Sequence, residues 1–147
     1  MEMATRTRPE DIVRLVVELS RTLMDSFDTE LSKLNLTLPQ AMLLHQLGDA
    51  LPMGGAAGKL HCDPSNVTGI VDRLETRGLI ARRQLAKDRR VKHLVLTAEG
   101  RRLKRRVDSV LSAAPGVSSL PAPEQAALHE LLTRSLRSRP RSGEAKR

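Results

Sequence analysis

Aromatic residues are almost absent from this chain: Phe27 is its one aromatic residue, and neither Trp nor Tyr occurs among the 147 positions. Any hydrophobic core that the sequence builds must therefore be aliphatic. With so few rings available for stacking, the chain also offers little to a ring-bearing small molecule.

Cysteine and long hydrophobic runs are scarce as well. A single cysteine, Cys62, excludes an intrachain disulfide framework and a zinc site made of cysteines alone. No run of 18 or more apolar residues is present, so no membrane span or membrane partner is predicted. The N-terminal segment MEMATRTRPED lacks the apolar stretch of a secretory signal. We therefore expect a soluble, cytoplasmic protein, in which Cys62 is a structural or incidental thiol rather than a redox switch.

The sequence contains no recognisable catalytic or metal-binding arrangement. Its histidines lack the close spacing of metal ligands; they are His45, His61, His93 and His129. His61, Cys62 and Asp63 are neighbours along the chain, and neighbours cannot form a nucleophile–base–orienter array. No enzyme activity, metal ion or cofactor is predicted.

Charge is the first positive signal. Lys and Arg number 25 against 17 Asp and Glu, which gives a formal net charge of +8. Such a field favours double-stranded DNA as a partner, although charge alone says nothing of sequence specificity. The basic run RRLKRR at 101–106 has two interpretations, a solvated helix face or a direct phosphate contact, and the first is favoured.

Apolar periodicity predicts a long helix over 10–34, and its stripe exceeds what a small core needs. Either a second subunit or a longer partner within the chain could cover it. A second helix begins near Leu36, where Thr37 and Gln40 have the spacing of a capping box. Residues 54–61 form a short helix at best, because Gly54, Gly55 and Gly58 each cost it about 1 kcal/mol relative to Ala.

The most informative segment is HCDPSNVTGIVDRLETRGL, residues 61–79. Asp63 is a suitable N-cap, Pro64 a suitable first residue and Gly78 a stop, which predicts a helix over 64–77. One face carries a buried stripe made of Val67, Ile70, Val71 and Leu74. The other face holds small, neutral or hydrogen-bonding residues where Glu and Lys are usual; these are Ser65, Asn66, Thr68 and Gly69, followed by Asp72 and Arg73.

A small hairpin follows this helix. The runs 79–84 and 91–97 are typical of strands, and the charged segment 85–90 joins them. An arginine at such a tip can enter the negative minor groove of DNA, and Asp88 could pair with Arg90 and hold it in place. Arg89 lies between them and belongs to the same candidate DNA-contacting tip.

Helices over 98–112, capped by Thr97, and over 123–137 complete the chain, and a basic tail at 139–147 is expected to be disordered. The fold class is therefore mainly α with a small β-hairpin. Residues 36–97 have the element order of a winged helix-turn-helix. A small-residue face lets the helix over 64–77 approach base edges in a major groove about 12 Å wide.

Residues 63–100 closely resemble the signature of the MarR family of bacterial transcription regulators. The matching elements are Asp63-x-Ser65-x-Val67-Thr68, Asp72-Arg73-Leu74-Glu75, Gly78-Leu79, Asp88-x-Arg90 and Leu94-x-Leu96-Thr97-x-x-Gly100. The opening LTLPQAMLL at 36–44 also fits the family's second helix. One departure is the short helix, where Ala56 replaces a larger apolar residue and glycine is unusually frequent. We therefore expect this helix to be mobile.

The resemblance implies an obligate homodimer in which residues 1–35 and 98–138 form a helical dimerisation region. Its two winged helices would grip a pseudo-palindromic operator, with Arg90 in the minor groove steadied by Asp88. The residues that read or position the duplex would be Ser65, Asn66, Thr68 and Arg73. Many members release DNA when a small, often phenolic anion binds between the lobes, which implies an effector of unknown identity.

The sequence thus predicts a site-specific regulator that represses by occupying a promoter. The alternative left open is a non-specific architectural DNA-binding protein. Specificity separates the two, because a regulator prefers its own site by about 10³-fold or more. A protein-interaction module with the same fold is disfavoured by Arg90 and by the positive charge.

Overall fold

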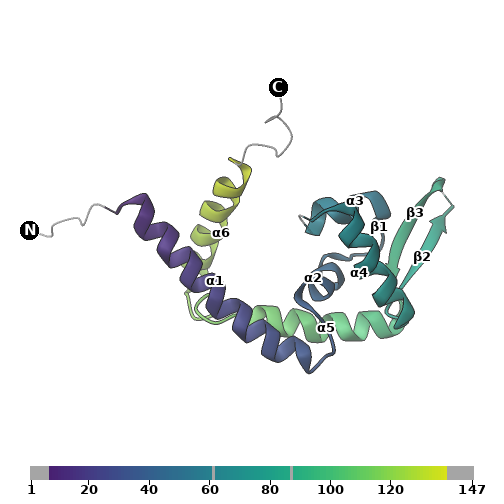
Figure 1. Ribbon diagram of the computed structural model, residues 1–147, viewed down its shortest axis with the longest axis horizontal. Helices are drawn as coiled ribbons and strands as arrows, with labels where there is room; N and C mark the ends of the chain where they lie inside the picture. Colours follow the sequence, from purple (N-terminus) through teal and green to yellow (C-terminus); the bar gives the residue numbers. More distant parts are fainter. Residues whose placement is uncertain (1–6, 61, 87, 139–147) are drawn as a thin grey trace, which may run out of the picture. The chain divides into compact units, whose positions relative to one another are not determined.

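The computed structural model describes residues 7–60, 62–86 and 88–138, and it confirms a mainly helical fold with a small sheet (Figure 1). The elements, in chain order, are α1 (Pro9–Ser32), α2 (Leu38–Gln46), β1 (Leu51–Pro52), α3 (Met53–Leu60), α4 (Pro64–Thr76), β2 (Ile80–Leu85), β3 (Asp88–Leu96), α5 (Ala98–Ser112) and α6 (Ala122–Arg137). They divide into two compact units, one ending at Ala114 and the other beginning at Pro115.

The core of the first unit is aliphatic, as the composition requires. Leu43 and Leu44 of α2 are fully buried, and so are Val71 and Leu74 of α4. Phe27 is only partly buried and packs against this cluster from α1. Since burial of such side chains contributes about 1.5–3 kcal/mol each, leucine and valine supply most of the driving force for this fold.

Helix α2 begins where the sequence predicts. The Thr37 hydroxyl accepts a hydrogen bond from the backbone N–H of Gln40, and the Gln40 side chain accepts one from the backbone N–H of Thr37. The other end of α2 is fastened to α5, because Nδ1 of His45 lies 2.8 Å from Oδ1 of Asp108. Local capping therefore starts the helix, and a contact between residues distant in sequence fixes its packing.

The sheet differs from the predicted two-stranded hairpin in two respects. A third strand, β1, pairs with β3 through Leu51 opposite Leu94, in the strand order β1-β3-β2. Strand β3 also begins at Asp88, so the prediction of a loop over 85–90 was wrong. The pairing of β2 with β3 is irregular after Gln84, which lies opposite Lys92, and it ends with Leu85 opposite Asp88. The hairpin extends away from the helices as a wing (Figure 1).

Helix α4 begins where the sequence predicts, with Asp63 as its N-cap and Pro64 as its first residue. Asp63 occupies the N-cap position, but its side chain makes no capping hydrogen bond. Its backbone carbonyl instead accepts from the N–H groups of Asn66 and Val67, at 3.0 and 3.2 Å. The first residue of the helix is Pro64, which has no N–H to satisfy.

A tight junction joins α4, the sheet and α5. Gly78 ends α4 with φ of +68°, a left-handed conformation that favours glycine. The Thr97 hydroxyl caps α5 by accepting from the N–H of Gly100, and it donates to the carbonyls of Gly78 and Leu79. The start of α5 is therefore held against the end of α4.

Helix α3 is regular over Met53–Leu60, and Ala56 is its one fully buried residue. Its expected mobility is not tested by this geometry and stays a prediction. A Cβ atom added at Gly54 or Gly58 would meet no atom within 4 Å, so packing does not require glycine at either position.

We expect Gly58→Ala to raise the free energy of unfolding by about 0.5–1 kcal/mol, because alanine favours the helix and no atom obstructs its methyl group. The same substitution should slow amide hydrogen exchange within α3. Gly48→Ala, a loop position with equally open surroundings, is the matched control. Unchanged exchange in α3 would show that its glycines do not weaken it.

Large apolar side chains are exposed on each unit. On α1 they are Ile12, Val13, Leu15, Val16, Val17 and Met24, and on α6 they are Leu131, Leu132 and Leu136. None of the α6 residues is buried.

The basic tail predicted to be disordered, 139–147, lies outside the described residues. Across the described ranges, no helix combines the length and hydropathy that crossing a membrane requires.

Candidate nucleic-acid interface

Helix α4 presents two opposite faces, as predicted. Val67, Val71 and Leu74 are buried against the rest of the first unit. Ile70, expected in the same stripe, is only partly buried and lines a surface groove. The outward residues are all exposed; they are Ser65, Asn66, Thr68, Gly69, Asp72 and Arg73. The structure therefore places these six α4 residues together on one accessible surface.

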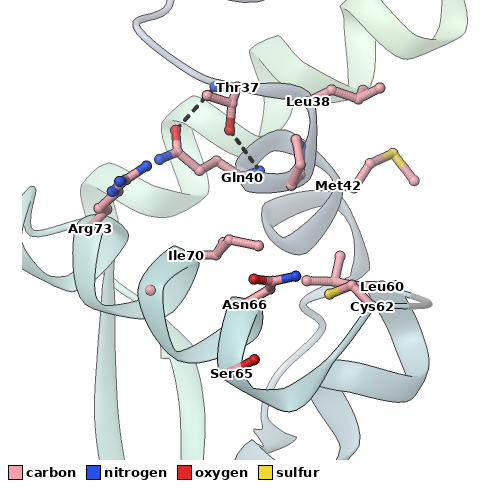
Figure 2. A pocket seen from close by; sticks show the side chains of 12 residues that line it. Thr37, Leu38, Gln40, Met42, Leu60, Cys62, Ser65, Asn66, Ile70 and Arg73 are labelled. Atoms are coloured by element: carbon pink, nitrogen blue, oxygen red, sulfur yellow. Dashed lines mark hydrogen bonds between the residues drawn. The ribbon is translucent and has the colours of Figure 1, made fainter.

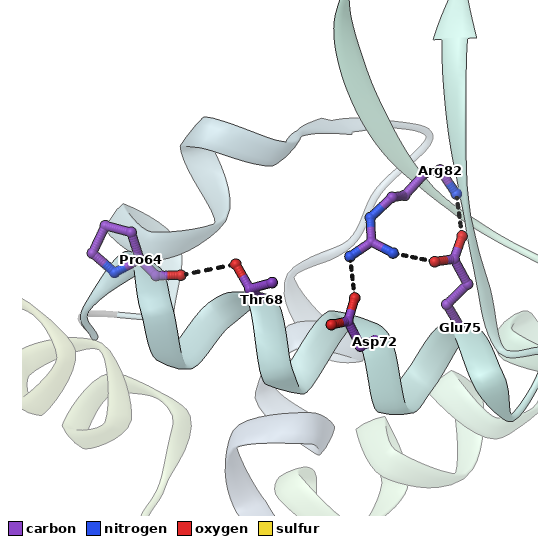
Figure 3. A network of polar contacts seen from close by, with 5 residues as sticks. All are labelled: Pro64, Thr68, Asp72, Glu75 and Arg82. Atoms are coloured by element: carbon purple, nitrogen blue, oxygen red, sulfur yellow. Dashed lines mark hydrogen bonds and ion pairs between the residues drawn. The ribbon is translucent and has the colours of Figure 1, made fainter.

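The Thr68 hydroxyl is already committed as a donor. Its Oγ1 lies 3.2 Å from the carbonyl oxygen of Pro64, one turn earlier (Figure 3). Threonines commonly bond the preceding turn in this way. Since its proton is used within the helix, the hydroxyl oxygen remains available as an acceptor, and its methyl group is exposed for apolar contact.

Gly69 lies at the centre of the outward face, and a Cβ atom there would meet nothing within 4 Å. Its lack of a side chain therefore serves no packing need in this chain. We expect Gly69→Ala to raise the free energy of unfolding by about 0.5–1 kcal/mol while weakening specific DNA binding about tenfold. Thermal unfolding and fluorescence anisotropy measure the two effects separately.

Gly54→Ala, at a second glycine with open surroundings, is the control for this experiment. It should leave DNA binding unchanged. Wild-type DNA affinity in Gly69→Ala would mean that α4 does not approach DNA closely at this position.

A groove of about 650 Å³ runs beside this face, between α4, the beginning of α2 and the residues that end α3 (Figure 2). Its residues are Thr37, Leu38, Pro39, Gln40, Met42, Leu60, Cys62, Ser65, Asn66, Gly69, Ile70 and Arg73. Arg73 lies at one end, and within the described residues its guanidinium group makes no hydrogen bond or ion pair. It is therefore available to a phosphate or another anion.

The sequence reasoning missed Arg82, which links the wing to α4. Its guanidinium group donates to the carboxylates of both Asp72 and Glu75, and its backbone N–H donates to Oε1 of Glu75 at 3.1 Å (Figure 3). The hydrogen bond with Asp72 is the main reason that the pKa of Arg82 is raised above its ordinary value. Because the folded-state pKa is raised, this stabilisation is fully present at neutral pH and is lost only as pH rises through that pKa.

The position of Asp72 on the outward face suggested that its carboxylate is available to DNA, but the structure shows otherwise. It is paired with Arg82, which neutralises much of the negative charge that Asp72 and Glu75 would otherwise present. The sequence element that could have indicated this ion-pair network is Asp72-Arg73-Leu74-Glu75. Sequence spacing alone did not show that a strand residue reaches both carboxylates.

The wing carries the remaining candidates. Arg89 and Arg90 are exposed residues of β3, and they lie between Asp88, which is opposite Leu85, and Lys92, which is opposite Gln84, where the pairing with β2 is irregular. The side chain of Asp88 lies outside the described part of the structure, so its predicted pairing with Arg90 stays a prediction. Both arginines are thus exposed beside the tip of the hairpin.

Other features singled out by the sequence have ordinary surroundings. Cys62 is partly buried beside the groove, and its oxidation is untested. In the basic run, Arg101 donates to the carbonyl of Leu96 and Arg102 pairs with Glu99, which accounts for part of its charge within the helix. Among the side chains that the structure describes, no group of three or more His, Cys, Asp or Glu could hold a metal ion.

Comparison with known proteins agrees with this geometry. A sequence model of the MarR family matches residues 36–92, which run from the start of α2 into β3. The chain is 30% identical over 106 residues to the organic hydroperoxide resistance transcriptional regulator of Bacillus subtilis, covering 71% of this chain and 72% of that relative. It is 29% identical over 122 residues to the HTH-type transcriptional repressor Rv2887 of Mycobacterium tuberculosis, covering 80% and 88%.

Among solved structures, CouR from Rhodococcus jostii RHA1 bound to p-coumaroyl-CoA superposes with a TM-score of 0.74 at 25% identity, over 89% of this chain and 95% of that one. The small-residue face of α4, the adjoining wing and these likenesses lead to one conclusion. The chain belongs to the MarR family and is a DNA-binding transcription regulator.

Proposed function

We propose that the protein is a homodimeric repressor that binds a pseudo-palindromic operator. The observation that carries this proposal is the outward face of α4, where short hydrogen-bonding side chains flank an unobstructed glycine. A helix presenting such a face can enter the major groove and contact base edges. The residues assigned to this contact are Ser65, Asn66, Thr68, Gly69 and Arg73.

The wing is assigned to the minor groove. Arg89 and Arg90 are exposed on β3, and a narrow minor groove attracts arginine through its negative potential. One of the two side chains can enter the groove while the other meets the phosphate backbone. Asp88 is assigned the role of steadying Arg90.

Repression follows from steric exclusion, because a dimer on two half-sites one helical turn apart covers the DNA that polymerase needs. The relative from Mycobacterium tuberculosis carries the name repressor, which supports this role. CouR bound to p-coumaroyl-CoA likewise supports control by a small-molecule effector.

Selection from random duplex DNA near 0.15 M salt tests the proposal. Enrichment of a two-fold symmetric motif is the expected result, and it would identify the operator. Tight binding without any enriched motif would instead establish a non-specific architectural protein, because its affinity would then come from phosphate contacts alone.

Dimerisation is proposed to use the helical region of residues 1–35 and 98–138. The apolar side chains exposed on α1 and on α6 form patches that a second copy would cover. Val13, which is 61% exposed, is in the α1 patch. A two-fold interface buries the same residue from both subunits, so a single substitution acts twice.

We expect Val13→Glu to weaken dimerisation by at least about 100-fold, because an unpaired charge buried at an interface costs several kcal/mol. Sedimentation equilibrium measures the change. Thr22→Glu adds the same charge on the polar side of α1 and should leave the dimer intact. A dimer that persists in Val13→Glu would place the interface elsewhere.

A further inference from the structure

The turn between α1 and α2 has the hydrogen bonds of a Schellman motif. The backbone N–H of Leu36 donates to the carbonyl of Leu31 at 3.0 Å, and that of Asn35 donates to the carbonyl of Ser32 at 2.9 Å. Asn35 takes the left-handed conformation that the motif needs, with φ of +52°. The motif uses the carbonyls of Leu31 and Ser32, but it has no donor for those of Leu34 and Asn35, which come later in the turn.

Arg77, at the end of α4, supplies the missing donors. Its Nη1 donates to the carbonyl of Asn35 at 2.5 Å, and its Nη2 donates to the carbonyl of Leu34 at 3.2 Å. Two neighbouring carbonyls suit the planar fork of a guanidinium group, whereas a lysine would reach them with a single nitrogen. The positive charge also favours the C-terminal end of α1. This contact, the Arg77 clamp, holds the end of α4 against the end of α1.

The clamp joins the helix that carries the DNA-contacting face to the helix that carries the proposed dimer patch. Ser65, at the start of α4, precedes Arg77 by 12 positions, a length of about 18 Å along the helix. A tilt of α4 by about 10° at the clamp would therefore move its start by about 3 Å. Successive base pairs are about 3.4 Å apart, so even this small tilt shifts the helix by nearly one base pair.

We propose that Arg77 is a positioning residue that sets the spacing between the two operator half-sites. By fixing the angle between α4 and α1, it fixes the separation of the two α4 helices across the dimer. The guanidinium group performs this role without touching DNA. The proposal rests on the proposed homodimer and its pseudo-palindromic operator. A side chain that only stabilised the fold would leave the preferred spacing unchanged, and one that bound a phosphate would weaken binding at every spacing.

A distance measurement without DNA tests the clamp itself. Nitroxide labels are placed on the native Cys62, just before α4, and on Thr22→Cys, at an exposed position on α1. The labelled chain is diluted with unlabelled protein, so that double electron–electron resonance reports distances within one chain. Adding Arg77→Gln should broaden the distance distribution at least about twofold, because the end of α4 loses a fastening. Arg105→Gln, which removes an exposed charge from α5, should leave the distribution unchanged. An unchanged distribution in Arg77→Gln would overturn the proposal.

DNA binding is then measured on duplexes that carry the selected half-sites at the selected spacing or with one base pair added. The extra base pair moves one half-site by about 3.4 Å and turns it by about 35°. The wild type should therefore prefer the selected spacing by at least about tenfold. This preference should fall below about threefold in Arg77→Gln, while affinity for a duplex with one half-site stays within about twofold of the wild type. Arg77→Lys keeps the charge but loses the fork, so it should also lose the preference.

A wild-type spacing preference in either Arg77 variant would overturn the proposal. An equal loss of affinity at every spacing, with a smaller salt slope, would overturn it in favour of a direct phosphate contact. Leu47→Val, which loosens the core at the end of α2, is the stability control and should lower Tm while keeping the preference. If its preference also fell, the effect of Arg77 would be one of general stability, which contradicts a positioning role. Failure to select a symmetric motif would refute the proposed function, whereas the distance measurement would still decide whether the clamp fixes α4.

Discussion

Gly100→Ala is expected to lower the free energy of unfolding by about 3 kcal/mol or more. A Cβ atom at Gly100 would lie 1.8 Å from the carbonyl oxygen of Leu79 and 2.9 Å from its carbonyl carbon. Both are backbone atoms, so a rotamer change cannot relieve the overlap.

The Leu79 carbonyl group also cannot move away without losing two hydrogen bonds. It accepts from the backbone N–H of Thr97 at 3.1 Å and from the Thr97 hydroxyl at 3.1 Å. Shifting α5 instead would disturb Leu96, which pairs with Ile80 at the end of the hairpin. Either adjustment breaks hydrogen bonds that hold α4, β2 and α5 together, and a buried group left unsatisfied adds about 1–3 kcal/mol.

Thermal and chemical denaturation measure this effect. For a chain of this length, a loss of about 3 kcal/mol corresponds to a fall in Tm of about 6–12 °C. Gly69→Ala is the matched control, since it adds the same methyl group to a helical glycine with open surroundings. A change within about 0.5 kcal/mol for Gly100→Ala would mean that α5 shifts freely at its start.

The sequence predicts those parts of the fold that depend on neighbours along the chain. Two helix caps could be predicted because each needs only a short, fixed spacing of residues. They are the capping box of Thr37 and Gln40 and the Thr97 cap. The α4 stripe was readable because helical periodicity places Val67, Val71 and Leu74 on one face. For the same reason the six outward residues of α4 could be named as a candidate surface.

Contacts between distant segments could not be predicted in this way. His45 meets Asp108 across 63 positions, and the close approach of Gly100 to Leu79 depends on how α5 crosses the sheet. Strand β1 has two residues, one of them a proline, which is too short for any alternation of side chains. Asp63 is the N-cap of α4, as predicted, but its side chain makes no capping hydrogen bond, and its backbone carbonyl accepts the N–H of Asn66 at 3.0 Å.

The second large effect concerns DNA binding through Arg82, which touches no DNA in the proposed complex and acts as a positioning residue. We expect Arg82→Met to weaken operator binding about 30-fold, because two carboxylates near the phosphates lose their partner. Stability should fall by only about 1–2 kcal/mol, since both carboxylates are solvent-accessible. Arg105→Met, which removes an exposed charge from α5, should change both quantities far less.

Arg82 can act by masking negative charge or by holding the wing in place, and neutralising its whole ion-pair network separates these two roles. Arg82→Met combined with Asp72→Asn and Glu75→Gln removes the unpaired carboxylates but also leaves the wing unfastened from α4. Recovery of DNA affinity in this triple variant would show that Arg82 acts by masking negative charge. If affinity stays low while stability recovers, the guanidinium group acts by orienting β2 and β3, so that Arg89 and Arg90 reach the duplex when α4 lies in the major groove. Wild-type affinity in the single variant would refute both roles.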